Sequence, residues 1–508
     1  MQGWIFDGAA RPKTRAQRLC LSLFAGLGGG ALGFARAGYE TVGVELWDAA
    51  CRDYTTLTGH ECVQLDLATC TPDDLRAVTG GRTPDVVLTS PPCQAFSGCL
   101  PLAKAGTAKY QELSSLAERG VWLALEAWDE PPRLLLLENV PRIQSRGRRW
   151  LDGMASLLAA YGYGWRETTH DCAELGGLAQ RRRRFLGVAR HHRSTPDPLY
   201  QPPLQEPRGV GDVLGDLPVP GPWAGDAGGP MHALPRLSAL NWLRLACIPA
   251  GADWRALPER VRLVVGEVDP RSTCERRAGS LGVTAWDEQT HAVIGAASIQ
   301  NTALQVADPR LTCSPRSGAY GVAGWRETGC TVVASACHDN GAYTAADPRL
   351  APRAARQNGG YGVNAWDDPS HAVIATAQVG VSWASVSDPR GWPAPTHELC
   401  VGDDGVVELH GPRVDLSSRA PTTMVIRALD GTWHRPMTTL ELAALQSLPV
   451  QVDGDWLVLD GASHRDWRKR IGNAIPAAAA EAIARQMTLT LDASDDGVLT
   501  QGATPRWG

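Results

Sequence analysis

The sequence has no apolar run approaching the roughly 18 residues that a membrane span needs. Its first segment carries Arg11, Lys13, Arg15 and Arg18 and has no apolar core of a secretion signal. Its 13 cysteines include no Cys-x-x-Cys pair and no histidine-rich spacing, so they indicate neither a zinc site nor a disulfide framework. We therefore expect a cytoplasmic protein with reduced thiols, no membrane partner and no metal.

The sequence also lacks an excess of positive charge, since 49 lysines and arginines stand against 54 aspartates and glutamates. The net charge of −5 argues mildly against a protein that binds nucleic acid with its whole surface. Local basic clusters either meet phosphates or form a solvated face, and charge alone does not separate these alternatives. The clusters are Arg142, Arg146, Arg148 and Arg149; Arg181 to Arg184; and Arg465, Arg468, Lys469 and Arg470.

A glycine-rich segment lies between a predicted strand and a predicted helix near the N-terminus. The apolar stretch 21–24 is followed by Ala-Gly-Leu-Gly-Gly-Gly at 25–30 and by a helical pattern over 31–37. Glycines let the backbone approach a ligand, and the first N–H groups of a helix are free to bind it. Many nucleotide-binding folds contain such a turn, so this feature alone has low specificity.

Acidic residues end the next two predicted strand–helix units. Glu45 follows the strand predicted over 41–44, about 20 positions after the glycines, where a carboxylate can bind both ribose hydroxyls. Asp66 ends the third unit. Three successive units that end in polar groups at the same sheet edge favour a nucleoside site.

A cysteine lies in a stiff loop after the apolar run 85–89, which predicts a buried parallel strand. The sequence Ser-Pro-Pro-Cys-Gln at 90–94 cannot continue that strand regularly, because proline lacks an N–H group. At the C-terminal end of a strand, the thiol of Cys93 can act as a nucleophile if its pKa is lowered or its proton is taken. The alternative is a small buried apolar side chain.

Polar groups follow two further predicted strands in the same region. The apolar run 133–137 predicts a buried strand that ends in Glu-Asn-Val at 138–140. A carboxylate at such a tip either caps a turn or serves a site on the sheet edge. The basic stretch Gln-Arg-Arg-Arg-Arg at 180–184 precedes another strand-like segment.

Taken in order, six motifs resemble those of the DNA cytosine-5 methyltransferase family. The resemblance covers roughly 20–192 and 420–487. It implies an α/β, Rossmann-like fold that binds S-adenosyl-L-methionine (AdoMet) and carries a large inserted target recognition domain. The motifs are Phe-Ala-Gly-Leu-Gly-Gly at 24–29, the acidic pair Glu45 and Asp66, Pro-Pro-Cys-Gln-x-Phe-Ser at 91–97, Glu-Asn-Val at 138–140, Gln-x-Arg-x-Arg at 180–184, and Arg-Ile-Gly-Asn-Ala-Ile-Pro at 470–476.

The resemblance also implies catalytic roles for four residues. Cys93 would add to C6 of cytosine, and Glu138 would bind N3 and the exocyclic amine. A carboxyl group at N3 makes the ring more electron-poor, which favours addition of a thiolate. Arg182 and Arg184 would hold the base and the nucleophile loop, whereas Arg181 and Arg183 would be solvated or near phosphate.

The cofactor site implied by the resemblance departs from the family pattern at two positions. Ser22 stands where many members have an aspartate, and Leu46 separates the acidic residue from Trp47, the type of side chain that usually stacks on adenine. Glu45 would bind the ribose and Asp66 the adenine amino group. The expected cofactor-binding residues are Phe24, Gly26, Gly28, Gly29, Glu45, Asp66, Pro92 and Asn473.

At 508 residues the chain is long enough for two or three domains. We expect an N-terminal arm over 1–18, a catalytic AdoMet-binding domain over 19–192, a target recognition region over 193–420, a return to the catalytic domain over 421–488, with an alanine-rich helix over 477–486, and a tail over 489–508.

The target recognition region repeats itself with a period of about 40 residues. Such a period suggests stacked units whose tryptophans either form the core or stack on bases. A metal site is not expected, since Cys330 replaces the histidine found at His291 and His371. The repeated phrases are Asp-Pro-Arg at 269–271, 308–310, 347–349 and 388–390, and Gly-Val-x-x-Trp at 282–286 and 362–366.

The resemblance implies methyl transfer from AdoMet to C5 of cytosine in duplex DNA, on a base flipped out of the helix. We expect a protein that is monomeric on DNA, with a possible cognate restriction endonuclease as partner. One alternative is a tRNA cytosine-5 methyltransferase, against which the long insertion argues. Another is a non-catalytic DNA-binding protein, against which the intact set Cys93, Glu138, Arg182, Arg184 and Asn473 argues.

Overall fold

The structure is a computed structural model in which the chain divides into two compact units, 1–268 with 359–508, and 269–358. The expected arm over 1–18 lies outside the described residues except for its last two positions. The structure describes residues 17–92, 115–195, 202–221, 227–250, 256–271, 363–364, 366–373, 385–390, 394–418 and 420–496, with the backbone of 108–114, 283–284, 305–306, 322–324 and 344–346.

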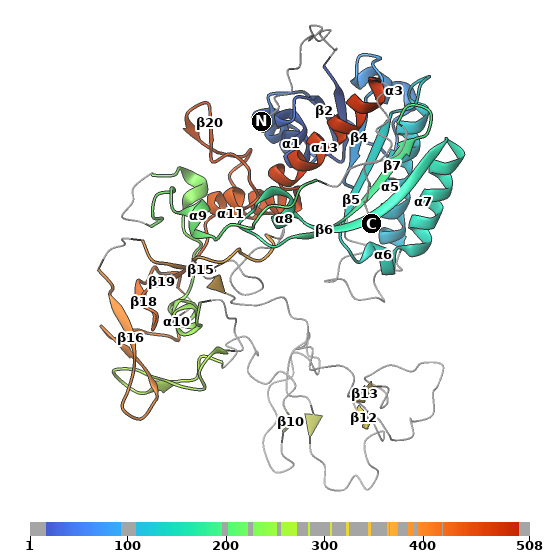
Figure 1. Cartoon of the computed structure of the whole chain (residues 1–508). Helices are drawn as coiled ribbons and strands as arrows, with labels where there is room; N and C mark the ends of the chain where they lie inside the picture. Colours follow the sequence, from blue (N-terminus) through green and yellow to red (C-terminus); the bar gives the residue numbers. More distant parts are fainter. Residues whose placement is uncertain are drawn as a thin grey trace, which may run out of the picture. The chain divides into compact units, whose positions relative to one another are not determined.

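A seven-stranded sheet with the order β3-β2-β1-β4-β5-β7-β6 organises the first unit (Figure 1). Neighbours from β3 to β5 are parallel, and β7 runs antiparallel to β5 and β6. This arrangement confirms the predicted α/β, Rossmann-like fold. The strands are β1 (Leu19–Leu23), β2 (Glu40–Glu45), β3 (Cys62–Gln64), β4 (Val86–Thr89), β5 (Leu134–Asn139), β6 (Tyr163–Asp171) and β7 (Arg183–His191).

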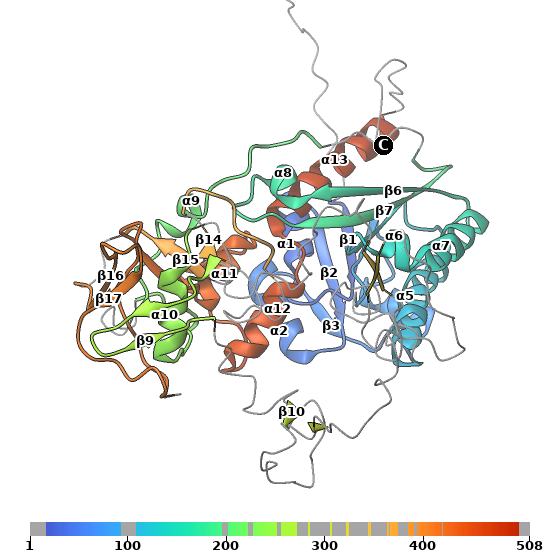
Figure 2. The same ribbon diagram turned by 90° about the horizontal axis from the view of Figure 1, so that it is seen from below.

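Helices cover both faces of this sheet, as Figure 2 shows. One face packs against α3, α5 and α7 around buried side chains such as Leu75 and Leu158. The other face packs against α1, α8 and α13 around Phe34. Since neither face meets water, the central strands are almost wholly apolar. The helices are α1 (Gly29–Arg36), α2 (Asp48–Thr58), α3 (Pro72–Val78), α5 (Ala108–Glu126), α6 (Ile143–Arg146), α7 (Arg148–Ala160) and α8 (Cys172–Gly176).

The last helix, α13 (Ala477–Asp495), is longer than the alanine-rich stretch that predicted it. Met487 and Leu491 continue its buried face against the sheet, so the helix does not stop where the alanines do. The expectation of a tail over 489–508 is therefore wrong for 489–495. No helix in the described part of the chain is both long and apolar enough to span a membrane.

A second sheet of eight strands has the order β14-β15-β19-β18-β16-β17-β8-β9. Its core includes α10 (Ala239–Cys247), where the stacked rings of Trp242 and Trp433 lie 5.9 Å apart. Because β18 and β19 belong to this sheet, the return to the first sheet begins after them and not at 421 as expected. The strands are β8 (Val261–Arg262), β9 (Glu267–Val268), β14 (Val363–Asn364), β15 (Ser385–Asp388), β16 (His397–Val401), β17 (Val407–His410), β18 (Ile426–Arg427) and β19 (Trp433–Pro436).

The predicted repeats form the same backbone pairing three times. β10 (Val283–Thr284) pairs with β11 (Gln305–Val306), β12 (Val322–Gly324) with β13 (Thr344–Ala346), and β14 with β15, each pair being parallel. The second strand starts 22 residues after the first in each copy, from 283 to 305, 322 to 344 and 363 to 385. The repetition of about 40 residues is thus a repetition of structure.

One tryptophan of the repeats lies within the described residues and is partly buried against the protein core. Trp366 packs against the cluster around α9 (Gly211–Leu214) and α11 (Thr439–Leu445). The guanidinium group of Arg390, from the fourth Asp-Pro-Arg phrase, lies 5.0 Å from the centre of its ring. For this copy the structure supports a core role over base stacking, and Trp286, His291 and Cys330 lie outside the described residues.

A buried ionic cluster ties the second sheet to the segment that returns to the first. Arg435 on β19 contacts Asp388 at 2.8 Å and Glu441 of α11 at 2.7 Å, and all three side chains are fully buried. Breaking such a pair leaves an uncompensated charge in the interior, so the cluster fixes this junction firmly. The remaining elements are η2 (Pro230–His232), β20 (Gln451–Val452), β21 (Asp455–Trp456) and α12 (His464–Asn473).

Candidate active site

The glycine-rich turn joins the end of β1 to α1 at the C-terminal edge of the sheet. Gly28 and Gly29 are required by packing, because a Cβ would lie 2.7 Å from the ring of Tyr54 at the first and 2.3 Å from the carbonyl oxygen of Ile475 at the second. Gly26 differs, since its φ is +55° and a Cβ there would meet no atom within 4 Å. The turn therefore exposes backbone to open space at Gly26.

The carboxylate of Glu45 lies beside this turn. Its Oε2 accepts a hydrogen bond from the N–H of Gly26 at 2.9 Å, and its Oε1 accepts from the N–H groups of Leu46 and Trp47, both at 3.0 Å. These bonds fix the carboxylate at the tip of β2. Each carboxylate oxygen has further lone pairs with which it could accept bonds from ligand hydroxyls.

Asp66 lies at the same edge, just beyond β3. Its Oδ1 accepts from the N–H of Ala68 at 2.9 Å, and its backbone oxygen accepts from Thr69 and Cys70 at 3.1 and 3.0 Å. This side chain therefore stabilises a turn, while its second carboxylate oxygen can still accept a bond.

Leu46 and Trp47 have different environments. The indole ring of Trp47 is covered by α12, with Nζ of Lys469 at 4.8 Å and the guanidinium carbon of Arg470 at 5.1 Å from its centre. Leu46 is 61% exposed, which is unusual for so large an apolar side chain. Leu46 was expected only to interrupt the spacing between Glu45 and Trp47, although an exposed apolar residue directly after the acidic one can itself contact a ligand.

The loop after β4 is anchored on both sides. The N–H of Ser90 donates to Leu23 at 3.3 Å and its hydroxyl donates to the Phe24 carbonyl at 3.2 Å, both next to the glycine-rich turn. On the other side, the amide of Asn139 donates to the carbonyl of Pro91 at 3.5 Å. Pro92 is the last described residue of this loop, and Cys93 lies outside the described residues.

An ion pair lies at the tip of β5 next to this loop. Nε of Arg184 lies 2.9 Å from Oε1 of Glu138, and the two side chains are only 15% and 13% exposed. Both line a cavity between the sheet and α13, together with the apolar side chains of Leu136 and Ile483. A largely buried carboxylate with one cationic partner can bind a polar ligand group much more strongly than a solvated one.

His170 was missed by sequence reasoning and lines the same cavity. It stands opposite Arg184 in the β6–β7 pairing. Burial, with a smaller contribution from Arg184, lowers the pKa of His170 to about 4. His170 belongs to none of the motifs and gives no sequence signal, because the β6–β7 register that places it here is a tertiary feature.

Arg182 and Arg184, predicted to act together, have separate environments. The fully buried guanidinium group of Arg182 donates to the carbonyl oxygens of Val373, Gly472 and Ala474 at 2.6, 2.9 and 2.9 Å. Arg182 therefore holds the segment around Asn473, whereas Arg184 faces Glu138. Arg181 and Arg183 are exposed, and Arg181 also forms an ion pair with Glu174 at 3.3 Å.

Asn473 ends α12 and has an exposed side chain. Two residues later the carbonyl oxygen of Ile475 lies against Gly29, so the structure brings this segment to the glycine-rich turn. Gly29 and Ile475 are 446 residues apart in the sequence, and the place of Asn473 in a cofactor site stays a prediction.

The basic clusters are partly used inside the protein. Arg148 forms ion pairs with Glu167 at 2.7 Å and with Asp152 at 2.9 Å. Arg470 is buried and paired with Asp53 at 2.5 Å. Both arginines already pair with carboxylates of the protein, which reduces the positive charge that these clusters offer to phosphate.

Residues 19–222 match the family described as C-5 cytosine-specific DNA methylase. The chain is 30% identical over 178 residues to the Type II methyltransferase M.HgiDI of Herpetosiphon aurantiacus, which covers 35% of this chain and 53% of that protein. It is 27% identical over 257 residues to the Type II methyltransferase M1.HphI of Haemophilus parahaemolyticus, covering 49% and 65%.

The chain thus spans between half and two thirds of the length of these two curated relatives. Among solved structures, the Entamoeba histolytica methyltransferase EhMeth aligns with a TM-score of 0.49 at 11% identity, covering 95% of this chain and 99% of that chain.

Proposed function

We propose that the chain, whose residues 19–222 match the C-5 cytosine-specific DNA methylase family, transfers a methyl group from AdoMet to C5 of cytosine in duplex DNA. The observation that carries the proposal is the Glu138–Arg184 pair, largely buried at 2.9 Å, beside a loop held between β1 and β5. A carboxyl group there can meet a base inserted at the sheet edge.

The proposed chemistry starts at Cys93, which directly follows the anchored Pro92. Its thiolate forms a bond to C6 of the flipped cytosine, and the electron pair of the C5–C6 double bond moves toward C5. Glu138 assists by donating a proton or hydrogen bond to N3, and Arg184 orients that carboxyl group. After C5 has been methylated, a base, which can be water, removes the C5 proton. The C6–S bond then breaks and frees Cys93.

The residues of the glycine-rich turn fit AdoMet, which when bound supplies an electrophilic methyl group. Gly26 leaves open space for the ligand, and the carboxylate of Glu45 is held ready for two ribose hydroxyls. The exposed side chain of Leu46 offers an apolar surface to adenine, in place of the aromatic ring that Trp47 would have provided. Asp66, Phe24 and the exposed Asn473 complete the proposed pocket.

The partners are proposed on the same premise. The relatives are named Type II methyltransferases, so we propose that this chain modifies DNA that a cognate restriction endonuclease would otherwise cut. The second sheet and the repeats would supply sequence recognition.

The test is incubation of the full chain with labelled AdoMet and either duplex DNA or tRNA. We expect label in the DNA only, recovered as 5-methylcytosine. Label in tRNA alone would identify an RNA methyltransferase, and the absence of label in both would contradict the enzymatic assignment.

A further inference from the structure

The β16–β17 hairpin carries polar, metal-binding types of side chain on its outward face. In the pairing of the two strands Cys400 is opposite Glu408, and Glu398 is opposite His410. The residue between each pair, Leu399 or Leu409, is buried in the core of the second sheet. Since side chains alternate along a strand, the four polar residues share the other face.

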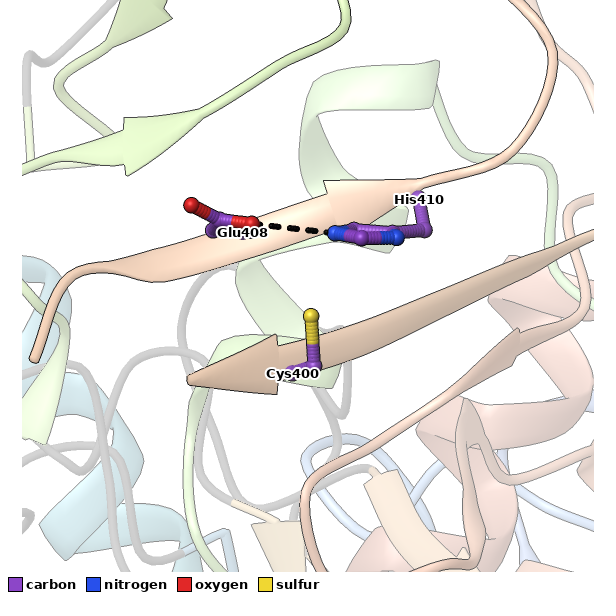
Figure 3. A group of neighbouring side chains, drawn as sticks. All are labelled: Cys400, Glu408 and His410. Carbon is purple, nitrogen blue, oxygen red and sulfur yellow. Dashed lines mark hydrogen bonds and ion pairs between the residues drawn. The ribbon is translucent and has the colours of Figure 1, made fainter. Parts of the chain in front are cut away.

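Three of these side chains converge, as Figure 3 shows. The ligand atoms of Cys400, Glu408 and His410 all lie within 4.8 Å of one another. Nε2 of His410 already lies 3.0 Å from Oε2 of Glu408. Ligands that share one tetrahedral zinc ion, at bond lengths of about 2.0–2.3 Å, are about 3–4 Å apart. Small changes of rotamer at the surface are enough to reach that spacing.

We propose that this hairpin binds one Zn²⁺ ion through Sγ of Cys400, Oε2 of Glu408 and Nε2 of His410. The ion takes the place of the direct bond between the imidazole and the carboxylate. The fourth position faces outward, where a water molecule or the carboxylate of Glu398 completes the tetrahedron. A thiolate with an imidazole selects zinc over Mg²⁺ or Ca²⁺, which prefer oxygen ligands.

The surroundings support a cation that is held in place. Arg262 on the neighbouring strand β8 binds Oε1 of Glu408 and is itself bound by Asp404. Arg262 therefore orients the carboxylate and leaves Oε2 for the metal, the arrangement typical of residues that support a metal ligand. The carboxylates of Glu398, Asp404 and Glu408 pair with only two guanidinium groups, those of Arg262 and Arg427. One negative charge is therefore left to favour a cation.

This site gives the ion a structural role, because it links the two strands of one hairpin in the second sheet. The sequence did not predict this site, because the chain has no Cys-x-x-Cys pair and no histidine-rich spacing. The cross-strand pair Cys400 and Glu408 is separated by seven residues, and His410 follows two positions after Glu408. No common zinc spacing resembles this pattern.

The experiment is titration of the full, chelator-treated chain with ZnCl₂ by calorimetry, with zinc content confirmed by mass spectrometry of the dialysed protein. We expect one Zn²⁺ per chain, lost in Cys400→Ser and in His410→Ala. The matched controls Cys62→Ser and His192→Ala should bind as the parent does. Arg262→Met should weaken binding about 10–100-fold, the usual effect of removing a group that supports a ligand.

Two further readouts identify the ligand. Zn²⁺ but not Mg²⁺ should protect Cys400 from alkylation, measured on its peptide, and Co²⁺ should give a thiolate charge-transfer band that Cys400→Ser lacks. Circular dichroism checks that each variant is folded. Absence of stoichiometric zinc in the parent would overturn the proposal, and so would unchanged binding in folded Cys400→Ser and His410→Ala variants.

Discussion

Replacing Arg182 by methionine should destabilise the first unit without touching the reacting base. The guanidinium group donates hydrogen bonds to the carbonyl oxygens of Val373, Gly472 and Ala474 and is almost fully buried. Methionine fills part of the volume but leaves these acceptors without donors. At about 1–3 kcal/mol for each buried group left unsatisfied, and without full additivity, we expect a loss of about 3–5 kcal/mol. Total stabilities are typically about 5–15 kcal/mol, so this loss is a large share.

Urea unfolding followed by tryptophan fluorescence measures the effect, with Arg183→Met as the matched control. Arg183 is the next residue along the chain and is exposed, so its replacement should change stability by less than about 0.5 kcal/mol. AdoMet affinity should also fall in Arg182→Met, because Gly472 and Ala474 flank Asn473. A variant as stable as the control, with normal AdoMet binding but no turnover, would refute this reasoning and place Arg182 at the base.

Glu138→Gln should slow methyl transfer by about 10²-fold in single-turnover assays; a change in DNA affinity alone would make Glu138 a positioning residue. Glu45→Ala should weaken AdoMet binding about 10–100-fold by calorimetry, the loss of one or two bonds to a charged group; unchanged affinity would remove Glu45 from the ribose site. The pKa of His170, about 4 in the fold, is below the unfolded value of about 6.5. The unfolded chain therefore binds the proton more tightly, and the stability that neutral His170 contributes is present above pH 6.5 and lost as pH falls toward 4. Urea midpoints between pH 7 and 4 should fall less in His170→Gln than in the parent, and equal slopes would contradict this environment.

The parts of the fold that rest on local pattern were predictable. The apolar runs 85–89 and 133–137 contain most of the strands β4 (Val86–Thr89) and β5 (Leu134–Asn139), because a strand covered on both faces is largely apolar. Glu138 directly follows the apolar run 133–137 and therefore lies near the C-terminal end of β5. The sequence also allowed the full length of α13 to be predicted, since Met487 and Leu491 continue a helical spacing beyond the alanines.

The parts of the fold and of the site that depend on contacts between distant segments could not be predicted from the sequence. Arg182 and Arg184 are two positions apart, and nothing local tells that Val373, Gly472 and Ala474 surround the first while Glu138 meets the second. The eight-stranded sheet takes β18 and β19 from beyond the expected boundary, because strand pairing is set by partners far along the chain. His170 lies beside the Glu138–Arg184 pair because the β6–β7 register places it opposite Arg184, and the local sequence does not reveal that register.

The most direct test of the central claim is to trap the bond between Cys93 and cytosine. Duplex DNA containing 5-fluorocytosine can undergo addition and methylation, but fluorine cannot leave as the C5 proton does, so the C6–S bond should persist. With AdoMet present, we predict a denaturant-resistant protein–DNA complex whose adduct maps to the Cys93 peptide by mass spectrometry, and no complex with Cys93→Ser. Methylation of normal DNA without any such adduct, or an adduct on a different cysteine, would contradict the account.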